Sequence, residues 1–473
     1  MIADLKPYPE YKESGHTWLG DVPTHWDVLP NRAIFSEIKD RDHPDEEMLS
    51  VTITRGIVRQ KALLADSSKK DSSNTNKAAY KLVQPGDIAY NKMRAWQGAL
   101  GASNLRGIVS PAYVVMRPVP GADPLYFHNL YRTSMFAKEA ERWSYGITSD
   151  MWSLRPEHFK LIGSLLPPPA EQSSIVRFLD HWNGRLEKAI RSKRRVIALL
   201  QEQKQAIIHR AVTRGLDPNV KLKDSGIPWL GKIPEDWEVR RLRTLTRRIE
   251  QGVSPQATGF LAEGDTWGVL KSGCINHGIF RQTEHKQLSK DFVIDPGIVV
   301  KVGDVLISRA CGSPKLVGSV GKVIALDYQL ILSDKTFRAA FGPSVDTDFM
   351  VYAMNSVYYR QQVEQAISGA DGMANNLPLS ELKSFVFAIP PPAEAAEIAS
   401  KLDEELETFT TAIARFEREI TLLREYRTRL TADVVTGKLD VRTAAAQLPE
   451  EVEDEPLPDP EIPEEESELE EIG

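Results

Sequence analysis

The stretch PPPAEQSSIVRFLDHWNGRLEKAI (residues 167–190), which runs on to AVTRGLD at residues 211–217, occurs twice in the chain. The second copy begins PPPAEAAEIASKLDEELETFTTAI at Pro390 and ends VVTGKLD at Asp440, with an offset of 223 residues at both ends. The last proline of each triplet suits a first helical turn, and Gly215 and Gly437 suit the left-handed stop after a helix. Each copy therefore predicts one helix of about forty residues, or roughly 60 Å.

An apolar seam with the spacing of a heptad repeat runs along both copies, interrupted in the first by Lys193 and Lys204. So narrow a stripe favours a single partner helix, and the other copy is the obvious candidate. The residues expected to pack are Leu186, Ile190, Ile197, Leu200 and Ile207 in the first helix, and Phe409, Ile413, Phe416, Ile420, Leu423 and Leu430 in the second.

A second repeat confirms that the chain is duplicated. YKESGHTWLGDVPTHW (11–26) and LKDSGIPWLGKIPEDW (222–237) are identical at eight of sixteen positions, with an offset of 211 residues. Each half is therefore a tryptophan motif, a globular region and a long helix, while the two globular regions differ apart from PGDI at Pro85 and VGDV at Val302. Trp18 and Trp26 suit apolar anchors of a packed turn, with stacking on nucleic acid as the alternative.

This doubled order resembles the DNA-specificity subunit of a Type I restriction–modification enzyme. The matching elements are SG-x-x-WLG-x-[VI]P-x-x-W in both halves, GDIAYNKMRAWQGALG at Gly86, GIVSPAYVVMRP at Gly107 and LRPEHFKLIGSLLPPPAEQ at Leu154, and the resemblance covers about residues 10–440. It implies a subunit that does no chemistry itself, carries two target-recognition domains, and holds two methyltransferase subunits on DNA.

The expected fold is α+β, with two globular target-recognition domains in tandem pseudo-repeat. Two long helices, packed as an antiparallel coiled coil as the resemblance implies, would separate them. The expected parts are a first recognition domain (1–166), a first spacer helix (167–217), a second recognition domain (218–389), a second spacer helix (390–440) and an acidic tail (441–473). A trial register with Leu186 opposite Val434 puts Lys193 near Arg427, and these like charges leave the register open.

Composition indicates a globular chain of 473 residues with 41% hydrophobic and 26% charged residues. The net charge of −7 conceals an uneven distribution, because residues 443–473 hold 13 acidic and no basic residues, so residues 1–442 carry +6. That balance weakly favours a polyanion-binding body. The tail mixes Glu with Pro and is predicted to be disordered, serving either solubility or competition with DNA. No apolar run is long enough for a membrane span, and Cys274 and Cys311 suit free thiols, so a cytoplasmic location is expected.

In the first half, strands are predicted at 48–54, 87–90 and 108–116. The segment NKMRAWQG (91–98) follows the second of these, and YGITSDMWSLR (145–155) precedes the helix. Arg can read guanine, Gln can read adenine and Lys can hold phosphate, although either segment could instead be a solvated turn. The candidate DNA-binding residues here are Lys92, Arg94, Gln97, Thr148, Ser149 and Arg155.

In the second half, WGVLKSG (267–273) and GDVLISR (303–309) suggest strands that enter loops. RACGSPK (309–315) takes the place of the Asn91 segment, and GADGMANNL (369–377) takes the place of the Thr148 segment. Asparagines can read adenine but are also common in turns, so both possibilities stay open. The candidates here are Lys271, Arg309, Ser313, Lys315, Asn375 and Asn376.

Motifs for catalysis are missing from the sequence. It contains no [DN]PP[YF] tetrapeptide of a methyltransferase and no zinc-spaced Cys or His cluster, and the nearest approach to a nucleotide-binding loop, at Gly321 and Lys322, has Leu316 and Val323 at required positions. We therefore expect no catalytic residues, no metal site and no cofactor bound by this chain.

The expected function is reading a bipartite, asymmetric site in double-stranded DNA. The resemblance implies two methyltransferase (modification) subunits and restriction/translocase subunits as partners, which would use S-adenosylmethionine, ATP and Mg²⁺. The alternatives are a duplicated coiled-coil scaffold that binds only protein, and the specificity component of a related enzyme that cuts beside its site.

Overall fold

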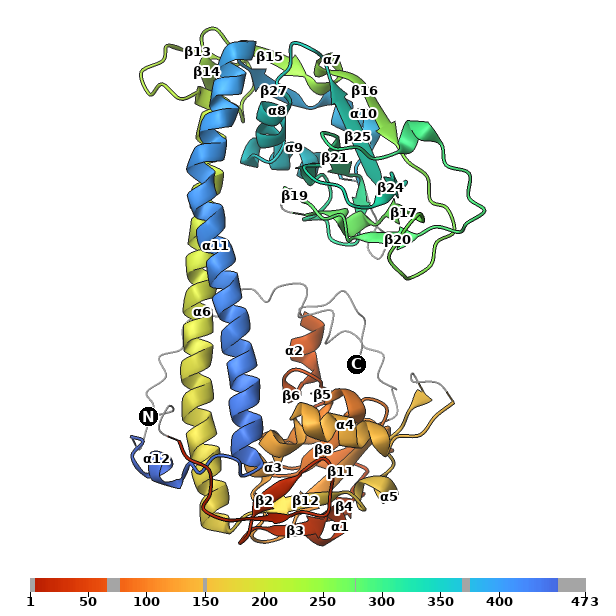
Figure 1. Ribbon diagram of the computed structural model, residues 1–473, viewed down its shortest axis with the longest axis vertical. Helices are drawn as coiled ribbons and strands as arrows, with labels where there is room; N and C mark the ends of the chain where they lie inside the picture. Colours follow the sequence, from red (N-terminus) through yellow and green to blue (C-terminus); the bar gives the residue numbers. More distant parts are fainter. Residues whose placement is uncertain (1–4, 66–76, 148–150, 277, 368–374, 450–473) are drawn as a thin grey trace. The chain divides into compact units, whose positions relative to one another are not determined.

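A computed structural model describes residues 5–65, 77–147, 151–276, 278–367 and 375–449. The chain divides into two compact units. Unit 1 comprises residues 1–195 and 416–473, and unit 2 comprises residues 196–415. Each unit contains one globular region together with part of both long helices (Figure 1).

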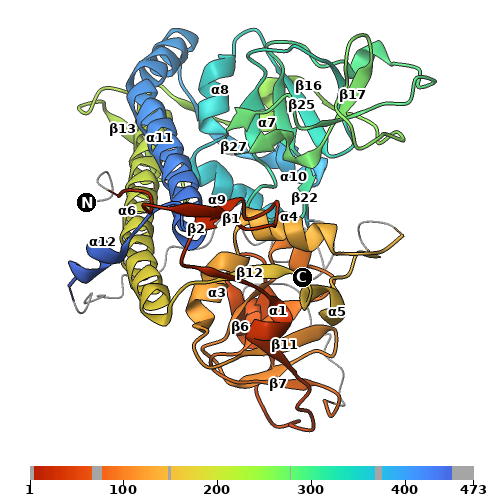
Figure 2. The ribbon, with the colours of Figure 1, turned by 60° about the horizontal axis from the view of Figure 1, so that its bottom comes forward.

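Unit 1 is built around a four-stranded antiparallel sheet with the order β4-β11-β8-β9. The β1–β2 hairpin lies against the C-terminal end of α11 (Figure 2), where the Tyr11 hydroxyl donates to the Gly437 carbonyl at 3.0 Å. The elements are β1 (Tyr11–Glu13), β2 (Asp21–Pro23), β3 (Asp27–Pro30), α1 (Asn31–Ile34), β4 (Phe35–Ile38), β5 (Leu49–Thr52), β6 (Gly56–Arg59), α2 (Gln60–Ala65), β7 (Lys81–Val83), β8 (Ile88–Asn91), η2 (Ala95–Gln97), β9 (Leu100–Ala102), β10 (Gly107–Val109), β11 (Tyr113–Pro118), α3 (Pro124–Tyr131), α4 (Ser134–Arg142), α5 (Pro156–Phe159), β12 (Gly163–Leu166) and α12 (Arg442–Ala446).

Unit 2 contains an equivalent four-stranded sheet with the order β16-β25-β21-β23, and adds a three-stranded sheet, β20-β17-β24, with its own apolar core. Its elements are β13 (Leu222–Asp224), β14 (Lys232–Pro234), β15 (Glu238–Arg241), α7 (Leu242–Leu245), β16 (Thr246–Gln251), β17 (Trp267–Leu270), η4 (Ser272–Cys274), β18 (Ile275–Asn276), β19 (Ile279–Phe280), β20 (His285–Gln287), η5 (Pro296–Ile298), β21 (Val305–Ser308), β22 (Ala310–Cys311), β23 (Val320–Lys322), β24 (Gln329–Ile331), β25 (Thr336–Phe341), α8 (Thr347–Ala353), α9 (Val357–Ala366), β26 (Asn375–Asn376), α10 (Leu379–Ser384) and β27 (Val386–Ile389).

The two predicted long helices are present as α6 (Pro169–Arg214) and α11 (Pro392–Val435). Each begins at the last proline of its triplet, as expected. The predicted stops are confirmed too, because Gly215 and Gly437 have φ angles of 74° and 75°, which L side chains rarely adopt.

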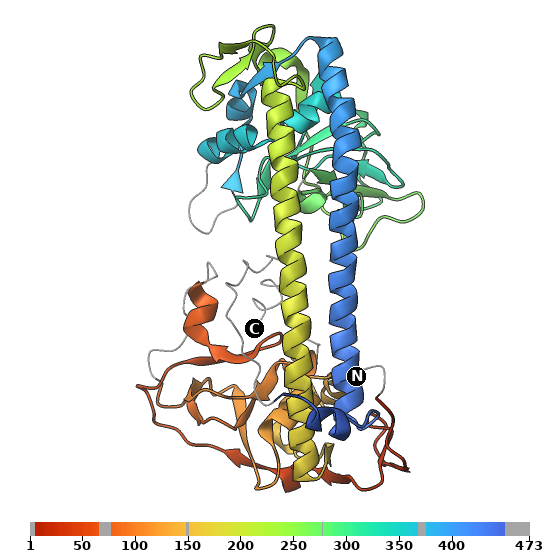
Figure 3. The same ribbon diagram turned by 90° about the vertical axis from the view of Figure 1, so that its left-hand side faces the viewer.

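Within unit 1 the two helices run antiparallel, because Glu187 on α6 meets Arg427 at 2.9 Å while Lys193, further along α6, meets Glu419 at 2.6 Å. Figure 3 shows the helices side by side. In unit 2, Lys204 donates to the Thr410 hydroxyl at 3.1 Å, and burial lowers the pKa of this ammonium group. The trial register is therefore wrong by about two helical turns.

The corrected register explains how the seam accommodates its charged residues. Lys193 and Arg427 do not face each other, because each lies beside a carboxylate of the other helix, and Lys193 also lies 5.3 Å from the Phe416 ring centre. Among the seam residues, Ile190, Ile420 and Leu430 are buried. The others are half-buried: Leu186, Ile197, Leu200, Ile207, Phe409, Ile413, Phe416 and Leu423.

The tryptophan motifs are structural anchors, as predicted. Trp26 and Trp237 are completely buried, and Trp18 is 8% exposed. The expected strands at 48–54 and 87–90 are confirmed as β5 and β8. The stretch 108–116, predicted as one strand, forms two strands, β10 and β11, because Pro111 has no N–H to continue a ladder and a turn forms there.

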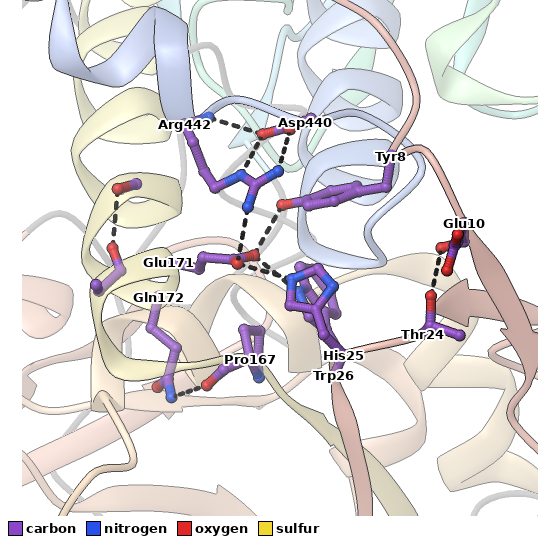
Figure 4. Close-up of polar contacts among 12 residues, drawn as sticks. Tyr8, Glu10, Thr24, His25, Trp26, Pro167, Glu171, Gln172, Asp440 and Arg442 are labelled. Atoms are coloured by element: carbon purple, nitrogen blue, oxygen red, sulfur yellow. Dashed lines mark hydrogen bonds and ion pairs between the residues drawn. The ribbon is translucent and has the colours of Figure 1, made fainter.

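Each tryptophan motif is bound to the start of a long helix through a repeated glutamate. Trp26 Nε1 donates to Glu171 at 2.8 Å, and Trp237 Nε1 donates to Glu394 at 3.1 Å. In unit 1 the glutamate has three further partners (Figure 4): the Tyr8 hydroxyl at 3.1 Å, His25 Nε2 at 2.7 Å and Arg442 Nη1 at 3.3 Å. Residues near both ends of the described chain thus meet at one buried carboxylate.

Candidate nucleic-acid interface

The first candidate loop follows β8 at the middle of the unit 1 sheet. Asn91 fixes its start, because the Met93 N–H donates to the Asn91 side-chain oxygen at 3.0 Å. Within the loop, Arg94 Nη1 donates to Gln97 Oε1 at 3.1 Å, so two of the predicted DNA-binding residues lie together. Lys92, Arg94 and Gln97 are all half-buried, which leaves part of each side chain open to a ligand.

The second candidate segment of unit 1 packs directly on this loop. The Leu154 N–H donates to the Lys92 carbonyl at 2.9 Å, and the rings of Trp96 and Trp152 meet edge-to-face at 5.4 Å. These two contacts join the loop to the segment before α5, and we call the joined pair of segments the junction. Arg155 follows Leu154 and is exposed, whereas Thr148 and Ser149 lie outside the described residues.

Unit 2 repeats the same junction with different side chains. The Leu377 N–H donates to the Arg309 carbonyl at 2.9 Å, which matches the bond between Leu154 and Lys92. Strands β22 and β26 extend it, pairing Ala310 with Asn376 and Cys311 with Asn375. Five of the six candidates from this half therefore lie on two joined segments: Arg309, Ser313, Lys315, Asn375 and Asn376.

Lys271, the sixth candidate, leads into η4, which lies against β21 and β22. Its ammonium group lies 3.6 Å from Glu284, and its backbone N–H donates to the carbonyl of the same residue. Arg309 is also held by its neighbours, because Nη1 donates to the Asp334 carbonyl at 2.9 Å and the guanidinium lies 5.8 Å from the Phe337 ring centre. These two cations thus have protein partners as well as positions at the junction.

Half-buried arginines bind backbone carbonyls in or next to the loops, and sequence patterns did not identify them. In unit 1, Arg132 donates to the carbonyls of Leu100 at 2.9 Å and Ile53 at 2.8 Å, and burial lowers the pKa of this guanidinium to about 10. In unit 2, Arg360 donates to the carbonyls of Val317 at 2.6 Å and Lys315 at 3.2 Å. A single arginine in a helical segment carries no local signal of such a role.

Lys81 adds positive charge beneath the first loop. Its ammonium group donates to the carbonyls of Pro111 and Tyr113, and Tyr113 is paired across the sheet with Asn91. Burial, and after it the charge of Lys92, lowers the pKa of the Lys81 ammonium group. Lys81 and Lys92 therefore lie close enough for their charges to interact, and such a pair of cations suits a polyanion.

Other kinds of site have no counterpart among the residues that the structure describes. There, no three His, Cys, Asp or Glu side chains are grouped so that they could hold a metal ion. None of the described helices has the length and hydropathy of a membrane span. Cys274 is buried, and this burial raises the pKa of its thiol to about 12, while Cys311 is a free, half-buried thiol.

Comparison with known proteins finds specificity subunits of Type I restriction enzymes among the relatives. The specificity subunit of the Type I restriction enzyme MjaVIII from Methanocaldococcus jannaschii is 25% identical over 289 residues, which cover 60% of this chain and 64% of that protein. The match thus spans less than two thirds of that relative. The EcoKI specificity subunit of Escherichia coli K12 is 22% identical over 464 residues, covering 91% of this chain and 95% of that protein. No protein-family model matches the chain.

The fold also has a solved counterpart. A chain from a structural study of complex assembly and conformational transition in the type I R-M system has a TM-score of 0.60 at 15% identity, and the match covers 88% of this chain and 99% of that chain. At this identity the likeness concerns the fold. The chain is therefore similar in sequence to specificity subunits of Type I restriction enzymes and in fold to a chain of a type I R-M system.

Proposed function

We propose that this chain recognises double-stranded DNA as the specificity subunit of a Type I restriction–modification complex. The observation that carries the proposal is the junction found in both units, where a loop after the central strand is bonded to the segment before the last short helix. One backbone hydrogen bond of the junction recurs in the two units, from Leu154 to Lys92 and from Leu377 to Arg309, while the side chains around it differ. A constant frame with variable side chains is what two readers of different sequences require.

In this proposal the two globular regions are target-recognition domains, each reading one half of an asymmetric, bipartite site. Helices α6 and α11 form one antiparallel coiled coil that sets an unread gap between the halves. The ion pairs Glu187–Arg427 and Lys193–Glu419 support that pairing because they fix one register in unit 1. The proposed domain boundaries remain 1–166, 167–217, 218–389 and 390–440, followed by the tail.

The chain itself performs no catalysis in this proposal. Two methyltransferase subunits and restriction/translocase subunits would supply it, using S-adenosylmethionine, ATP and Mg²⁺, and the complex would work in the cytoplasm. The homology to specificity subunits supports this division of labour.

Salt-dependent binding to duplex DNA tests the proposal. With its methyltransferase partners present, the chain should bind a duplex with an affinity that falls steeply with salt, by a slope of about −0.9 for each phosphate contact. Lys92→Gln should make that slope shallower by about one unit. Lys12→Gln, a control on the β1–β2 hairpin, should leave it unchanged.

The protein-only scaffold makes the opposite prediction. Methyltransferase subunits that co-purify with the chain while duplex binding is absent at low salt would favour that alternative and contradict DNA recognition. The second alternative, an enzyme that cuts beside its site, would be recognised by a partner in which nuclease and methylase are fused.

A further inference from the structure

We propose that residues 450–473, the part of the acidic tail (441–473) that follows α12, bind along a basic face of helix α6 in unit 1 and shield that face from DNA. The basic face is defined by Arg177, Lys188 and Arg195. The inference concerns a surface outside the loop junctions described above, and it does not depend on which DNA sequence those loops read.

The described chain ends on this face. Arg177 Nη2 donates to the Leu448 carbonyl at 2.6 Å and to the Pro449 carbonyl at 3.1 Å, while Leu448 is buried. Helix α12, just before it, buries Ala444 and Ala445 in the core of unit 1. The exit of the tail from the folded unit is therefore fixed at Arg177, at one end of the basic face.

Two further exposed cations of the helix lie in line with Arg177, whereas the exposed Arg185 points about 80° away and lies 5.0 Å from the Trp182 ring centre. Lys188 and Arg195 follow by 11 and 18 residues, which at about 3.6 residues per turn brings both back to within about 20° of the direction of Arg177. Arg177, Lys188 and Arg195 are all exposed. Two acidic residues of α6 lie near this face. Glu187 is paired with Arg427. The pKa of Asp180 is raised, first by burial and then by the charge of Asp123.

The tail matches this face in charge and in reach. It holds 13 carboxylates in 24 residues and no basic residue. An extended chain of that length spans up to about 80 Å, whereas the distance from Arg177 to Arg195 along the helix is about 27 Å. A tethered acidic segment beside a row of cations has a high effective concentration there, so weak ionic contacts are enough to occupy it.

The first test is zero-length cross-linking of the full chain with a carbodiimide, which joins a carboxylate to an amine as an amide. The proposal predicts cross-links between Lys188 and glutamates of 450–473 at low salt and their loss in 1 M salt, where the Debye length is about 3 Å. Tail cross-links to other lysines with none to Lys188 would overturn it.

The second test measures binding of a non-specific 30-base-pair duplex to the full chain at low salt. Replacing the 13 acidic residues of 450–473 with Gln or Asn should raise the affinity about tenfold, because the face becomes free for phosphates. In a chain that also carries Lys188→Gln and Arg195→Gln, the same tail replacement should have little effect. The matched control, Arg243→Gln with Arg247→Gln on exposed arginines of unit 2, should preserve the tenfold effect.

The effect of the tail replacement in these three backgrounds decides the matter. An equal tail effect in the Lys188/Arg195 variant and in the Arg243/Arg247 control would mean that the tail acts only through total charge, and would overturn the proposal. So would an unchanged affinity after the tail is neutralised. Because all substitutions are at exposed positions or in the tail, folding of the chain is checked simply by its unchanged circular dichroism spectrum.

Discussion

At the scale of single residues, Glu171 illustrates what a repeat can and cannot indicate. The glutamate of PPPAE recurs as Glu394, and both accept a hydrogen bond from a repeated tryptophan. The repeat therefore contains the signal for that pair. Its contacts with Tyr8 and Arg442 carry no such signal, because those residues come from opposite ends of the chain and are brought together only by folding.

The sequence predicted the positions of the candidate DNA-binding residues better than it predicted the arginines that bind the backbone around them. PGDI and VGDV predicted two equivalent loops, and the structure brings Lys92 and Arg309 to equivalent junctions. Arg132 and Arg360, which bind backbone carbonyls in or next to the loops, were missed because any residue can supply a carbonyl and the sequence therefore gives no sign of such a contact. Whether the candidates contact bases stays a prediction.

A residue-scale prediction concerns acid stability and His128. Burial lowers the pKa of this imidazole from its ordinary 6.5 to about 4, and its Nδ1 accepts the Ala102 N–H at 3.2 Å. Because the folded pKa is the lower one, the unfolded chain binds more protons between these values, and stability is lost as the pH falls from 6.5 towards 4. At pH 5 the loss from this residue should be about 2 kcal/mol.

The measurement is the free energy of unfolding between pH 7 and pH 5 for the native chain and for His128→Asn, whose amide oxygen can accept the same N–H without titrating. The variant should lose less stability over this range than the native chain. Parallel pH dependences in the two proteins would show that His128 does not contribute.

At the scale of elements, the long helices were predictable because their signals are local. Proline at the start and glycine after the end act on the backbone of the same helix, whatever surrounds it. The register was not predictable in this way, since it depends on which side chains of two distant segments meet. The like charges of Lys193 and Arg427 argued against the trial register, and the observed pairing gives each a carboxylate instead.

At the scale of elements, we predict that a charge at a seam position destabilises the chain more than the same charge at the neighbouring exposed position. Leu200→Asp and Leu423→Asp should each destabilise the chain by about 2 kcal/mol, because a half-buried seam position would receive an unpaired charge. Leu199 and Leu422 are 52% and 54% exposed, so Leu199→Asp and Leu422→Asp should cost about 0.5 kcal/mol or less. All four variants replace Leu with Asp within a helix, so the change in helix propensity is the same at the seam position and at its neighbour.

The measurement is urea denaturation followed by circular dichroism at 222 nm, a wavelength that reports helix content. The urea midpoint of Leu200→Asp should lie below that of Leu199→Asp, and the midpoint of Leu423→Asp below that of Leu422→Asp. Equal midpoints within both pairs would mean that the seam does not hold the helices together.

At the scale of the whole molecule, the duplication was the most informative feature of the sequence. Repeated ends with diverged middles predicted two units of one design, and both units do contain the same four-stranded sheet and the same loop junction. In the three-stranded sheet of unit 2, β17 confirms the strand predicted from WGVLKSG (267–273). The sheet as a whole was not predicted, because β20 and β24 lie in the region where the two halves have no common pattern.

Independent reading by the two halves predicts the result of a domain exchange. If the proposed function is right, replacing residues 27–166 with the equivalent residues of a Type I specificity subunit should change one half of the recognised site and leave the other half and the gap unchanged. The expected loss for each mismatched base pair of the old half-site is about 1–3 kcal/mol. Simultaneous change of both half-sites would contradict independent reading domains.

The most direct test of the central claim is a genome-wide map of N6-methylated adenines in cells that express this chain with its methyltransferase subunits. The account predicts one motif made of two different half-sites separated by a gap of fixed length in which any base is accepted. A continuous motif without a gap, or no methylation that depends on this chain, would contradict it.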